Sequence, residues 1–207
     1  MTIRNIIFDL GNVLISYQPE SFHAERGATR DETLTYIREV YNSPEWQLID
    51  KGVMSVQEAI SSIGSRSVLS HAEIALVFDF REELLFPIEK NVALLKTLKK
   101  EGFRLYYLSN FPQDMFSLLS RKHHFFSMFD GGVVSSAEKM LKPQPEIYEL
   151  LLERYSLEKK ETIFIDDLLP NILGAESVGL TTIHLTRHDE LHGKLAELLP
   201  EVVFPQA

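Results

Sequence analysis

The sequence predicts an α/β fold, in which a parallel sheet carries helices on both faces and a helical module is inserted after the first strand. Short β-rich segments alternate with helical ones, and this alternation breaks once, near the amino terminus. Such alternation is typical of a parallel sheet, because parallel strands need a long crossover connection, usually a helix. The β-rich segments are residues 3–8, 105–108, 133–135, 162–165 and 182–185.

The helices between these strands carry ordinary start and stop residues. Gly102 and Gly179 each follow a helical segment and end it, since glycine readily adopts the left-handed conformation beyond a helix. Pro145 opens a third helix, where a missing amide hydrogen is harmless. The predicted helices cover residues 91–101, 145–155 and 171–178, and residues 187–207 predict an amphipathic helix with an extended end.

The segment that breaks the alternation indicates an inserted cap of three or four helices. Three capping boxes, each a Ser or Thr followed three residues later by Glu, mark helix starts, and apolar residues at helical spacing form two stripes that can pack together. We therefore divide the chain into a sheet-containing core, residues 1–16 and 87–207, and a helical cap, residues 17–86. The boxes are Thr29–Glu32, Ser55–Glu58 and Ser70–Glu73, and the stripes are Leu34, Ile37, Tyr41 and Ile74, Phe78, Leu85.

Three residues of the cap region allow two interpretations each. Pro19 and Pro87 stand near the two ends of the insert, where they serve either stiff hinge strands or ordinary loops. Trp46 belongs either to the apolar core of the cap or to the entrance above a substrate.

Composition limits the classes of function. With 207 residues, of which 44% are hydrophobic, the chain can bury one sizeable core and a smaller module. A net charge of −9 opposes nucleic acid but leaves a small anionic substrate possible. The absence of cysteine excludes disulfides and thiolate zinc sites and favours a cytoplasmic location. No apolar run reaches membrane-spanning length, so neither insertion nor secretion is predicted; monomer and dimer both stay open.

Four segments each place a chemically distinct group at the boundary of a strand or helix. Asp9 ends the first strand and precedes a Gly-Asn turn, Ser109 follows the second strand, and Asp166 and Asp167 follow the fourth. Lys142 lies in the run Leu-Lys-Pro-Gln-Pro. Since ligands bind at the carboxyl ends of parallel strands, we expect these groups to converge on one crevice.

Three carboxylates in one crevice repel one another and an anionic substrate unless cations offset their charge. Mg²⁺ and Lys142 are the natural candidates. Asp9 can then attack phosphorus and form an aspartyl phosphate, while Ser109 hydrogen-bonds a phosphoryl oxygen. Lys139 competes for the lysine role, but the Lys-Pro-x-Pro-x-Ile-Tyr context favours Lys142 and makes Lys139 a solvated charge.

These four segments, in this order and with an insert after the first, resemble the haloacid dehalogenase superfamily of phosphotransferases. The resemblance implies a Rossmann-like, doubly wound core and a C1 cap, the kind inserted directly after the first motif. It implies Mg²⁺ held by Asp9, the Gly11 carbonyl oxygen and Asp167. Asp166 would then sit beside the metal, through water.

The same resemblance implies how the phosphoryl group is held. Lys142 would pair with Asp9 and with the phosphoryl group, and Ser109 together with the Asn110 backbone amide would cradle that group. It also implies a cis peptide bond between Lys142 and Pro143.

The first motif departs from the Asp-x-Asp pattern of most phosphatases in that superfamily. Gly11 stands where a second Asp would protonate the leaving group and then activate water, a loss worth on the order of 10² to 10⁴ in rate. The loss is smaller for a good leaving group such as a sugar 1-phosphate, and the Phe-Asp-Leu-Gly-Asn-Val form resembles a subset that includes an α-glucose 1-phosphatase. A sugar phosphate such as a hexose 1-phosphate is therefore the expected substrate. His23 and Tyr17 are minor candidates for the missing role.

The leading hypothesis is a Mg²⁺-dependent phosphatase of a small phosphorylated metabolite, and two other functions stay open. A metal-independent 2-haloacid dehalogenase also lacks the second Asp, but the Asp166–Asp167 pair argues against it. A catalytically weakened protein that binds a phosphorylated ligand or a partner is supported by Gly11 and opposed by Asp9, Lys142 and Asp167.

Overall fold

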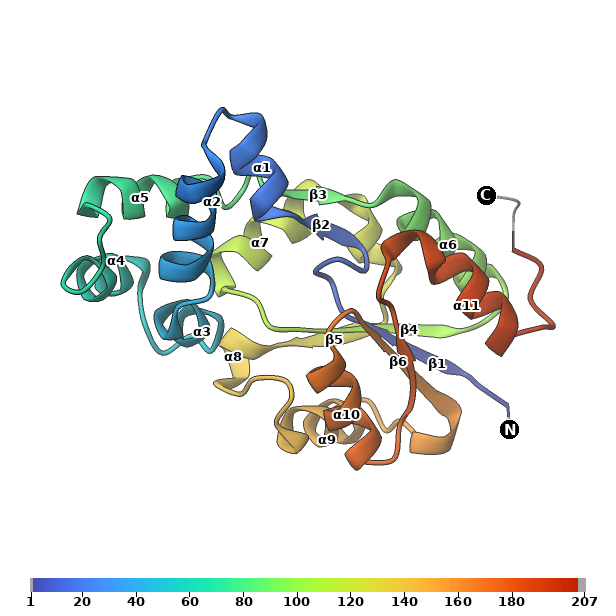
Figure 1. Cartoon of the computed structure of the whole chain (residues 1–207). Helices are drawn as coiled ribbons and strands as arrows, with labels where there is room; N and C mark the ends of the chain where they lie inside the picture. The colour runs from blue at the N-terminus through green and yellow to red at the C-terminus, as the bar shows by residue number, and fades with distance from the viewer. Residues whose placement is uncertain (1, 205–207) are drawn as a thin grey trace.

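A parallel sheet forms the centre of the molecule, which a computed structural model describes for residues 2–204. Its five strands follow the order β5-β4-β1-β6-β7, and Figure 1 shows helices on both of its faces. The predicted α/β fold with a doubly wound parallel sheet is therefore confirmed. The strands are β1 (Asn5–Phe8), β4 (Arg104–Ser109), β5 (Gly131–Val134), β6 (Thr162–Asp166) and β7 (Thr181–His184).

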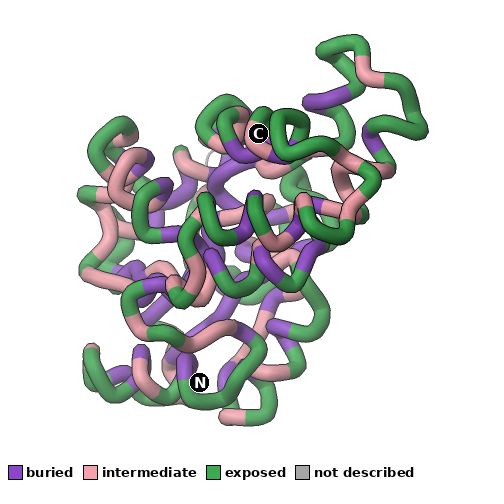
Figure 2. Tube along the Cα trace, turned by 90° about the vertical axis from the view of Figure 1, so that its left-hand side faces the viewer, coloured by how far each residue is buried: buried purple, intermediate pink, exposed green. Residues whose placement is uncertain are grey.

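Each face of the sheet has its own apolar core, because successive side chains of a strand point to opposite faces. Ile6 and Phe8 of β1 pack with α6, α7 and α11, whereas Ile7 packs with α9 and α10 on the other face. Figure 2 shows the buried segments running through the middle of the molecule and the exposed ones at its periphery. The covering helices are α6 (Glu89–Lys100), α7 (Gln113–Lys122), α9 (Pro145–Arg154), α10 (Leu169–Ser177) and α11 (Leu191–Leu198).

The strand order reverses at β1, which lies between β4 and β6. Phe8 at the end of β1 is in register with Tyr107 of β4 and Ile165 of β6. The chain fills one side of β1 with β4 and β5 before it crosses to β6 and β7 on the other side. The carboxyl ends of β1, β4 and β6 therefore border the crevice at which open α/β sheets bind ligands.

A small antiparallel ribbon of β2 (Ile15–Tyr17) and β3 (Leu85–Pro87) joins this core to a group of helices. The sequence left hinge strands and ordinary loops both open near Pro19 and Pro87, and the structure places Pro87 in β3 and Pro19 at the start of α1. Figure 1 shows the helices gathered beyond the carboxyl end of β1, and all three predicted capping boxes are formed. The helices are α1 (Pro19–Glu25), α2 (Arg30–Tyr36), α3 (Pro44–Asp50), α4 (Val56–Gly64) and α5 (His71–Asp79).

One residue of the first predicted apolar stripe, Leu34, does not face the core. A π-helical turn, Ile37–Tyr41, follows α2 directly, and its wider turn shifts the helical phase. Leu34, before this turn, is 46% exposed, whereas Ile37 packs against the core and Tyr41 is buried. The members of the second stripe, Ile74, Phe78 and Leu85, are all buried, although Leu85 belongs to β3 rather than to a helix.

The remaining elements are short. The helix α8 (Ser135–Glu138) follows β5 directly, where the sequence predicted the end of a strand, and 3₁₀ turns cover residues 124–128, 159–161 and 188–190. The predicted carboxyl-terminal helix is α11, and residues 205–207 of the predicted extended end lie outside the described residues. Within residues 2–204, no helix combines the length and the apolar character that crossing a bilayer would need.

Candidate active site

Asp9 stands where the chain leaves the centre of the sheet. Its amide still donates to the Ile165 carbonyl at 2.8 Å, so the main chain is held in line with β6. The Leu10 carbonyl then accepts the amides of Leu14 and Ile15 at 2.9 and 2.8 Å, which closes a tight turn. The neighbouring strands fix the backbone on both sides, and the Asp9 carboxylate lines the cavity beyond the end of β1.

Lys142 lies buried between two carboxylates. Its ammonium group is 2.9 Å from Asp9 Oδ1 and 2.6 Å from Asp166 Oδ2, and its side chain is 1% exposed. The contact with Asp166 is a hydrogen bond, whereas the contact with Asp9 is an ion pair without hydrogen-bond alignment. The peptide bond between Lys142 and Pro143 is cis, as the resemblance implied.

The Asn110 side chain holds the main chain of Lys142. Its carbonyl oxygen accepts the Lys142 amide at 2.9 Å, and its amide group donates to the Lys142 carbonyl at 3.0 Å. The sequence assigned Asn110 a role through its backbone amide only. Its side chain therefore has a second, positioning role that joins the segment after β4 to the lysine segment. Ser109, the residue before it, is buried and lines the cavity at the end of β4.

Asp166 is fully buried and accepts hydrogen bonds at both oxygens. Besides Lys142, the Leu168 amide donates to Oδ1 at 2.9 Å, and the Asn171 side chain donates to Oδ1 and Oδ2 at 3.0 and 3.1 Å. Sequence reasoning missed Asn171. Its place in the first turn of α10, directly after the acidic pair, was the available signal. Because these partners occupy both oxygens, Asp166 orients Lys142 rather than facing the cavity.

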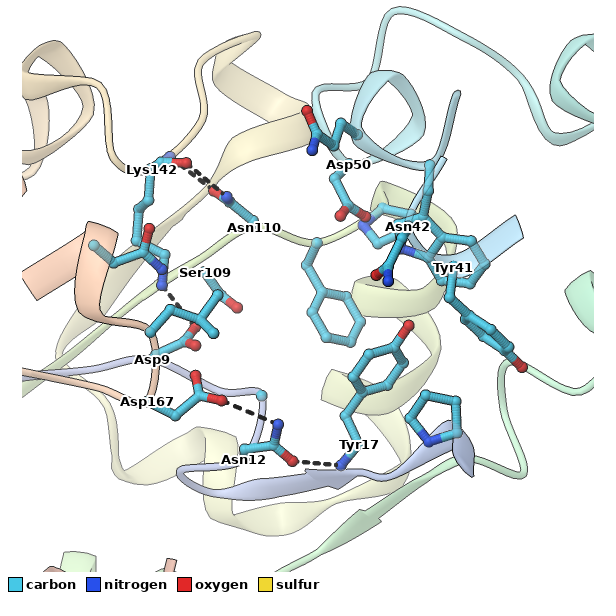
Figure 3. A pocket seen from close by; sticks show the side chains of 18 of the residues that line it. Asp9, Asn12, Tyr17, Tyr41, Asn42, Asp50, Ser109, Asn110, Lys142 and Asp167 are labelled. Carbon is cyan, nitrogen blue, oxygen red and sulfur yellow. Dashed lines mark hydrogen bonds and ion pairs between the residues drawn. The ribbon is translucent and has the colours of Figure 1, made fainter. Parts of the chain in front are cut away.

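Asp167 lines the cavity and remains half-buried. The Asn12 side chain donates to its Oδ2 at 3.0 Å, and the His184 ring lies 3.0 Å from its main-chain carbonyl. Asn12 adopts a left-handed φ of 52°, which asparagine tolerates, and its side-chain Oδ1 accepts the Tyr17 amide. Asn12 thus connects the acidic cluster with the start of the ribbon (Figure 3).

The carboxylates of Asp9, Asp166 and Asp167 form one acidic cluster, with one ligand atom of each within 4.8 Å of the others. Burial raises the pKa of Asp9 to about 7, and the charges of Asp166 and Asp167 add to this rise while Lys142 opposes it. Burial also raises the pKa of Asp167. Burial lowers the pKa of Lys142, but Asp166 and Asp9 outweigh this effect and hold it above its ordinary value. One ammonium group therefore does not balance the cluster.

The donor set fits a hard divalent cation. Asp9 Oδ1 is buried and accepts no hydrogen bond from any described residue, and Asp167 uses only Oδ2 for Asn12. Carboxylate oxygens of this kind are the ligands that Mg²⁺ prefers. Asp166 belongs to the cluster by distance, but its bonded oxygens make it a poor direct ligand.

A cavity of about 940 Å³ opens above these residues. Figure 3 shows Asp9, Ser109, Lys142 and Asp167 on one side of it and Tyr41, Asn42 and Asp50 on the other. Aromatic and aliphatic side chains make up much of the opposite wall, and three charged residues, Glu20, Asp50 and Arg81, interrupt it. The apolar lining residues from this side include Tyr17, Ile37, Tyr41, Trp46 and Leu85, and those from the sheet-containing side include Phe111, Met115, Leu141 and Leu168.

Three minor candidates from the sequence take different places. His23 is buried, hydrogen-bonds the Tyr41 hydroxyl at 2.9 Å and does not line the cavity. Tyr17 does line it, and its hydroxyl points into it (Figure 3). Trp46 satisfies both of its interpretations, because it stacks on Phe78 at 5.3 Å and also lines the cavity.

Lys139 is exposed, as the sequence predicted, and it also makes one contact with the cap side of the cavity. Its ammonium group donates a hydrogen bond to the Gly52 carbonyl, which follows α3. It takes no part in the acidic cluster, whereas Lys142 does. Asp50 and Arg81, which also line the cavity, carried no sequence signal, because nothing local in the sequence shows that a helix end far along the chain faces β1.

Comparison with known proteins finds a hydrolase family and phosphatase relatives. Residues 3–179 match the family model described as a haloacid dehalogenase-like hydrolase. A sesquiterpene phosphatase of Aspergillus oryzae, astK, is 32% identical over 185 residues, which cover 89% of this chain and 91% of that protein. A phosphorylated carbohydrates phosphatase of Thermotoga maritima is 26% identical, over 91% of this chain and 88% of that protein.

Solved structures share the fold. The HAD family enzyme bt-2542 of Bacteroides thetaiotaomicron, in complex with magnesium and inorganic phosphate, aligns with a TM-score of 0.65 at 22% identity, covering 88% of this chain and 93% of that one. The L-2-haloacid dehalogenase of Xanthobacter autotrophicus aligns with a TM-score of 0.66 at 19% identity, covering 99% and 85%. At these identities the likeness extends to the fold alone.

Proposed function

The chain belongs to the haloacid dehalogenase-like hydrolase family, and from that premise we propose that it is a phosphatase that hydrolyses small phosphate monoesters through an aspartyl phosphate on Asp9. The observation that carries the proposal is the ion pair of a buried lysine with the carboxylate at the end of β1. An ammonium group held 2.9 Å from a nucleophilic oxygen also lies where it can neutralise a transferring phosphoryl group.

In the proposed reaction the site residues divide into a nucleophile and the groups that bind the phosphoryl oxygens. Asp9 attacks phosphorus, and the ester oxygen leaves with the alcohol. Lys142, fixed by Asp166, and Ser109, together with the Asn110 amide, bind the phosphoryl oxygens. Water then attacks the aspartyl phosphate, which releases phosphate and restores the Asp9 carboxylate.

Mg²⁺ is part of the proposal because the donor set fits it. Asp9 and Asp167 would hold it directly with the Gly11 carbonyl oxygen, and Asp166 would contribute through water. When bound, the cation neutralises phosphoryl oxygens that gain charge in the transition state. It would also offset the carboxylate repulsion that adds to burial in raising the pKa of Asp9 and Asp167.

We also propose the division of the chain into a core, residues 1–16 and 87–207, and a C1 cap, residues 17–86. The β2–β3 ribbon supports it, because the chain enters the helical part through β2 and returns to the core through β3. Ribbon residues Tyr17 and Leu85 line the cavity, so a hinge here would change the cavity when it moves. A cytoplasmic location stays a proposal that rests on the absence of cysteine.

The alcohol part of the substrate has two candidates. A sugar phosphate, such as a hexose 1-phosphate, is supported by the good leaving group that Gly11 favours, by polar wall residues such as Gln18, Asn42 and Gln47, and by the carbohydrate phosphatase relative. The Phe-Asp-Leu-Gly-Asn-Val motif adds the resemblance to an α-glucose 1-phosphatase.

An ester of an apolar alcohol is the second candidate, and the aromatic wall favours it. Tyr17, Tyr41, Trp46 and Phe111 surround the space into which the alcohol would extend, and apolar surface of this kind excludes water from a hydrocarbon chain. A terpenoid phosphate has this character, and the similar astK is a sesquiterpene phosphatase.

A panel of phosphate monoesters tests the function and separates the two candidates. We expect phosphate release from at least one class, sugar phosphates or terpenyl phosphates, to need Mg²⁺ and to stop with EDTA. Asp9→Asn should lower kcat by roughly 10⁴-fold or more, as loss of a covalent nucleophile does in other hydrolases. Metal-independent turnover, or halide release from a 2-haloacid with no phosphatase activity, would favour the dehalogenase instead. Binding of phosphorylated ligands without any turnover would favour the weakened binding protein.

A further inference from the structure

We propose that Asp50, the last residue of α3, supplies the acid–base function for which position 11 has no side chain. The inference rests on the proposed phosphatase function and adds the group that moves the proton. Asp50 and Asp9 line the same cavity, and Figure 3 shows the Asp50 carboxylate directed into it from the side opposite Asp9. An entering ester therefore lies between the nucleophile and this carboxyl group.

The main chain of Asp50 is fixed to the catalytic side of the cavity. The Ser135 hydroxyl, which is fully buried, donates to the Asp50 carbonyl at 2.5 Å and accepts the Phe111 amide at 2.9 Å. Phe111 lies two residues after Ser109. One hydroxyl group thus holds both Asp50 and the segment that would cradle the phosphoryl group.

A second contact fixes the same turn. Lys139 donates a hydrogen bond to the Gly52 carbonyl, two residues after Asp50. Gly52 has a φ of +72°, and a Cβ there would collide with the Ser136 carbonyl oxygen. The end of α3 therefore sits so close to α8 that only glycine fits, and this packing limits how far Asp50 can move away from the sheet.

The Asp50 carboxylate is not occupied by other groups. Across residues 2–204, no side chain hydrogen-bonds it or forms an ion pair with it, although Arg81 is near enough to interact with its charge. Asp166, by contrast, has partners at both oxygens. A carboxyl group that is anchored through its main chain and free at its side chain is available to a ligand.

The surroundings of Asp50 favour its protonated form. Burial raises its pKa well above the ordinary value, the negative charge of Asp9 raises it further, and Arg81 opposes both. Tyr17 faces it from the ribbon, and burial together with the charges of Tyr41 and Asp50 holds the pKa of Tyr17 well above its ordinary range. Lys139, which follows α8, donates its hydrogen bond to the Gly52 carbonyl and not to the Asp50 carboxylate. A neutral carboxyl at the start of the reaction can donate a proton.

Asp50 completes the proton balance of both steps. When Asp9 attacks phosphorus, the P–O bond to the alcohol breaks, and the leaving oxygen takes the proton of the Asp50 carboxyl. In the second step the Asp50 carboxylate takes a proton from the attacking water, the bond between Asp9 and phosphorus breaks, and phosphate leaves. Tyr17 cannot serve as this base near neutral pH, and His23 lies outside the cavity.

Asp50→Asn tests the proposal with two esters that differ in their need for a proton. A primary alkyl phosphate needs an acid to release its alcohol, whereas p-nitrophenyl phosphate releases a stable anion. We expect Asp50→Asn to lower kcat/KM for the alkyl ester by about 10²- to 10⁴-fold and to lower the rate of phosphoenzyme formation from p-nitrophenyl phosphate far less. The phosphoenzyme should accumulate, because its hydrolysis has lost the base. Asp79→Asn, an exposed carboxyl of α5, is the control and should match the wild type.

Adding the acid at position 11 provides a second measurement. Within 4 Å of a Cβ at Gly11 the structure places only Asp9 Oδ2, at 4.0 Å, among the described residues. A side chain therefore fits, and Gly11→Asp combined with Asp50→Asn should recover at least a tenth of the lost alkyl phosphatase rate. Equal losses on both esters without phosphoenzyme accumulation, or no recovery in the double variant when its melting curve shows a folded protein, would overturn the proposal. Failure of the phosphatase function itself would look different, because the wild type would then form no phosphoenzyme.

Discussion

The buried contacts around Lys142 show how single residues set the chemistry of the site. Asp166 does not line the cavity, and Asn171 borders it only at the start of α10. Together they determine where the lysine points, because Asn171 holds Asp166 and Asp166 holds Lys142. Asp166 supplies the charge that keeps Lys142 protonated despite its burial. Asn171 in turn satisfies Asp166. A charge this deeply buried is tolerable only with all of its partners present.

Removing Asn171 should therefore destabilise the whole chain. Asn171→Ala takes away a donor that serves both oxygens of Asp166, and leaving a buried charged acceptor short of a partner costs about 1–3 kcal/mol. Chemical denaturation measures the free energy of unfolding. Asn42→Ala, at an exposed position, is the control, with an expected change within about 0.5 kcal/mol. Equal values for the two variants would mean that water replaces Asn171 without loss.

The raised pKa of Asp9 leads to a pH-dependent prediction for the metal-free protein. The folded chain keeps the Asp9 proton up to about pH 7, whereas the unfolded chain releases it near the ordinary pKa of 3.8. Folding thus binds a proton between these values, and the contribution of Asp9 to stability falls as the pH rises through this window. Because asparagine does not ionise, Asp9→Asn removes this pH-dependent loss of stability.

Melting temperatures in EDTA test this sign. We expect Asp9→Asn to be more stable than the wild type at pH 7.5, and the gap between them to shrink as the pH falls toward about 4. A gap that is constant across this range would show that Asp9 ionises in the folded protein as it does in the unfolded one.

At the scale of elements, capping boxes determine where the helices of the cap begin, whereas tertiary packing determines which of their side chains are buried. The boxes at Thr29, Ser55 and Ser70 form with both reciprocal hydrogen bonds. The π turn after α2 has no comparable local cause, and across it the side chains pass from the exposed Leu34 to the buried Tyr41. Capping is a property of four consecutive residues, whereas the phase of a longer helix depends on what it packs against.

Ser55→Ala should weaken α4 by removing its amino-terminal cap. The Ser55 hydroxyl accepts the Glu58 amide at 3.2 Å, and its loss typically costs about 0.5–2 kcal/mol. Ser61→Ala changes an exposed serine inside the same helix, where alanine is the better helix former, so stability should stay the same or rise. Denaturation midpoints of the two variants give the comparison, and a drop for Ser61→Ala as large as that for Ser55→Ala would contradict it.

At the scale of the whole molecule, the acidic cluster links ligand binding to stability. Residues from β1 and the end of β6 meet there, so a cation that binds both ties together segments that are far apart in the chain. A ligand that binds only the folded state stabilises it by mass action, by about 2.7 kcal/mol at a hundredfold excess over its Kd.

Mg²⁺ should accordingly raise the melting temperature of the wild type, with a midpoint that follows the Mg²⁺ concentration. Asp167→Asn should lose most of this shift, and Asp79→Asn should keep it. The melting temperature is measured without substrate, so it tests the cation site separately from turnover. A shift that survives in Asp167→Asn would place the bound cation elsewhere.

The sequence by itself determined the α/β core, the capping boxes of the inserted helices and the meeting of Asp9, Lys142 and the acidic pair. The core and the capping boxes follow from short-range patterns, and the meeting of Asp9 with the acidic pair follows from the rule that parallel strands end at one edge of a sheet. Lys142 lies in a turn before α9, and its place was expected from the charge balance and from the family resemblance. The tertiary structure alone decided that Asn171 satisfies Asp166, that His23 turns away from the cavity and that Asp50 faces Asp9. The physical reason is that these contacts join segments whose separation along the chain carries no periodic signal, so only the packing of helices on the sheet brings them together.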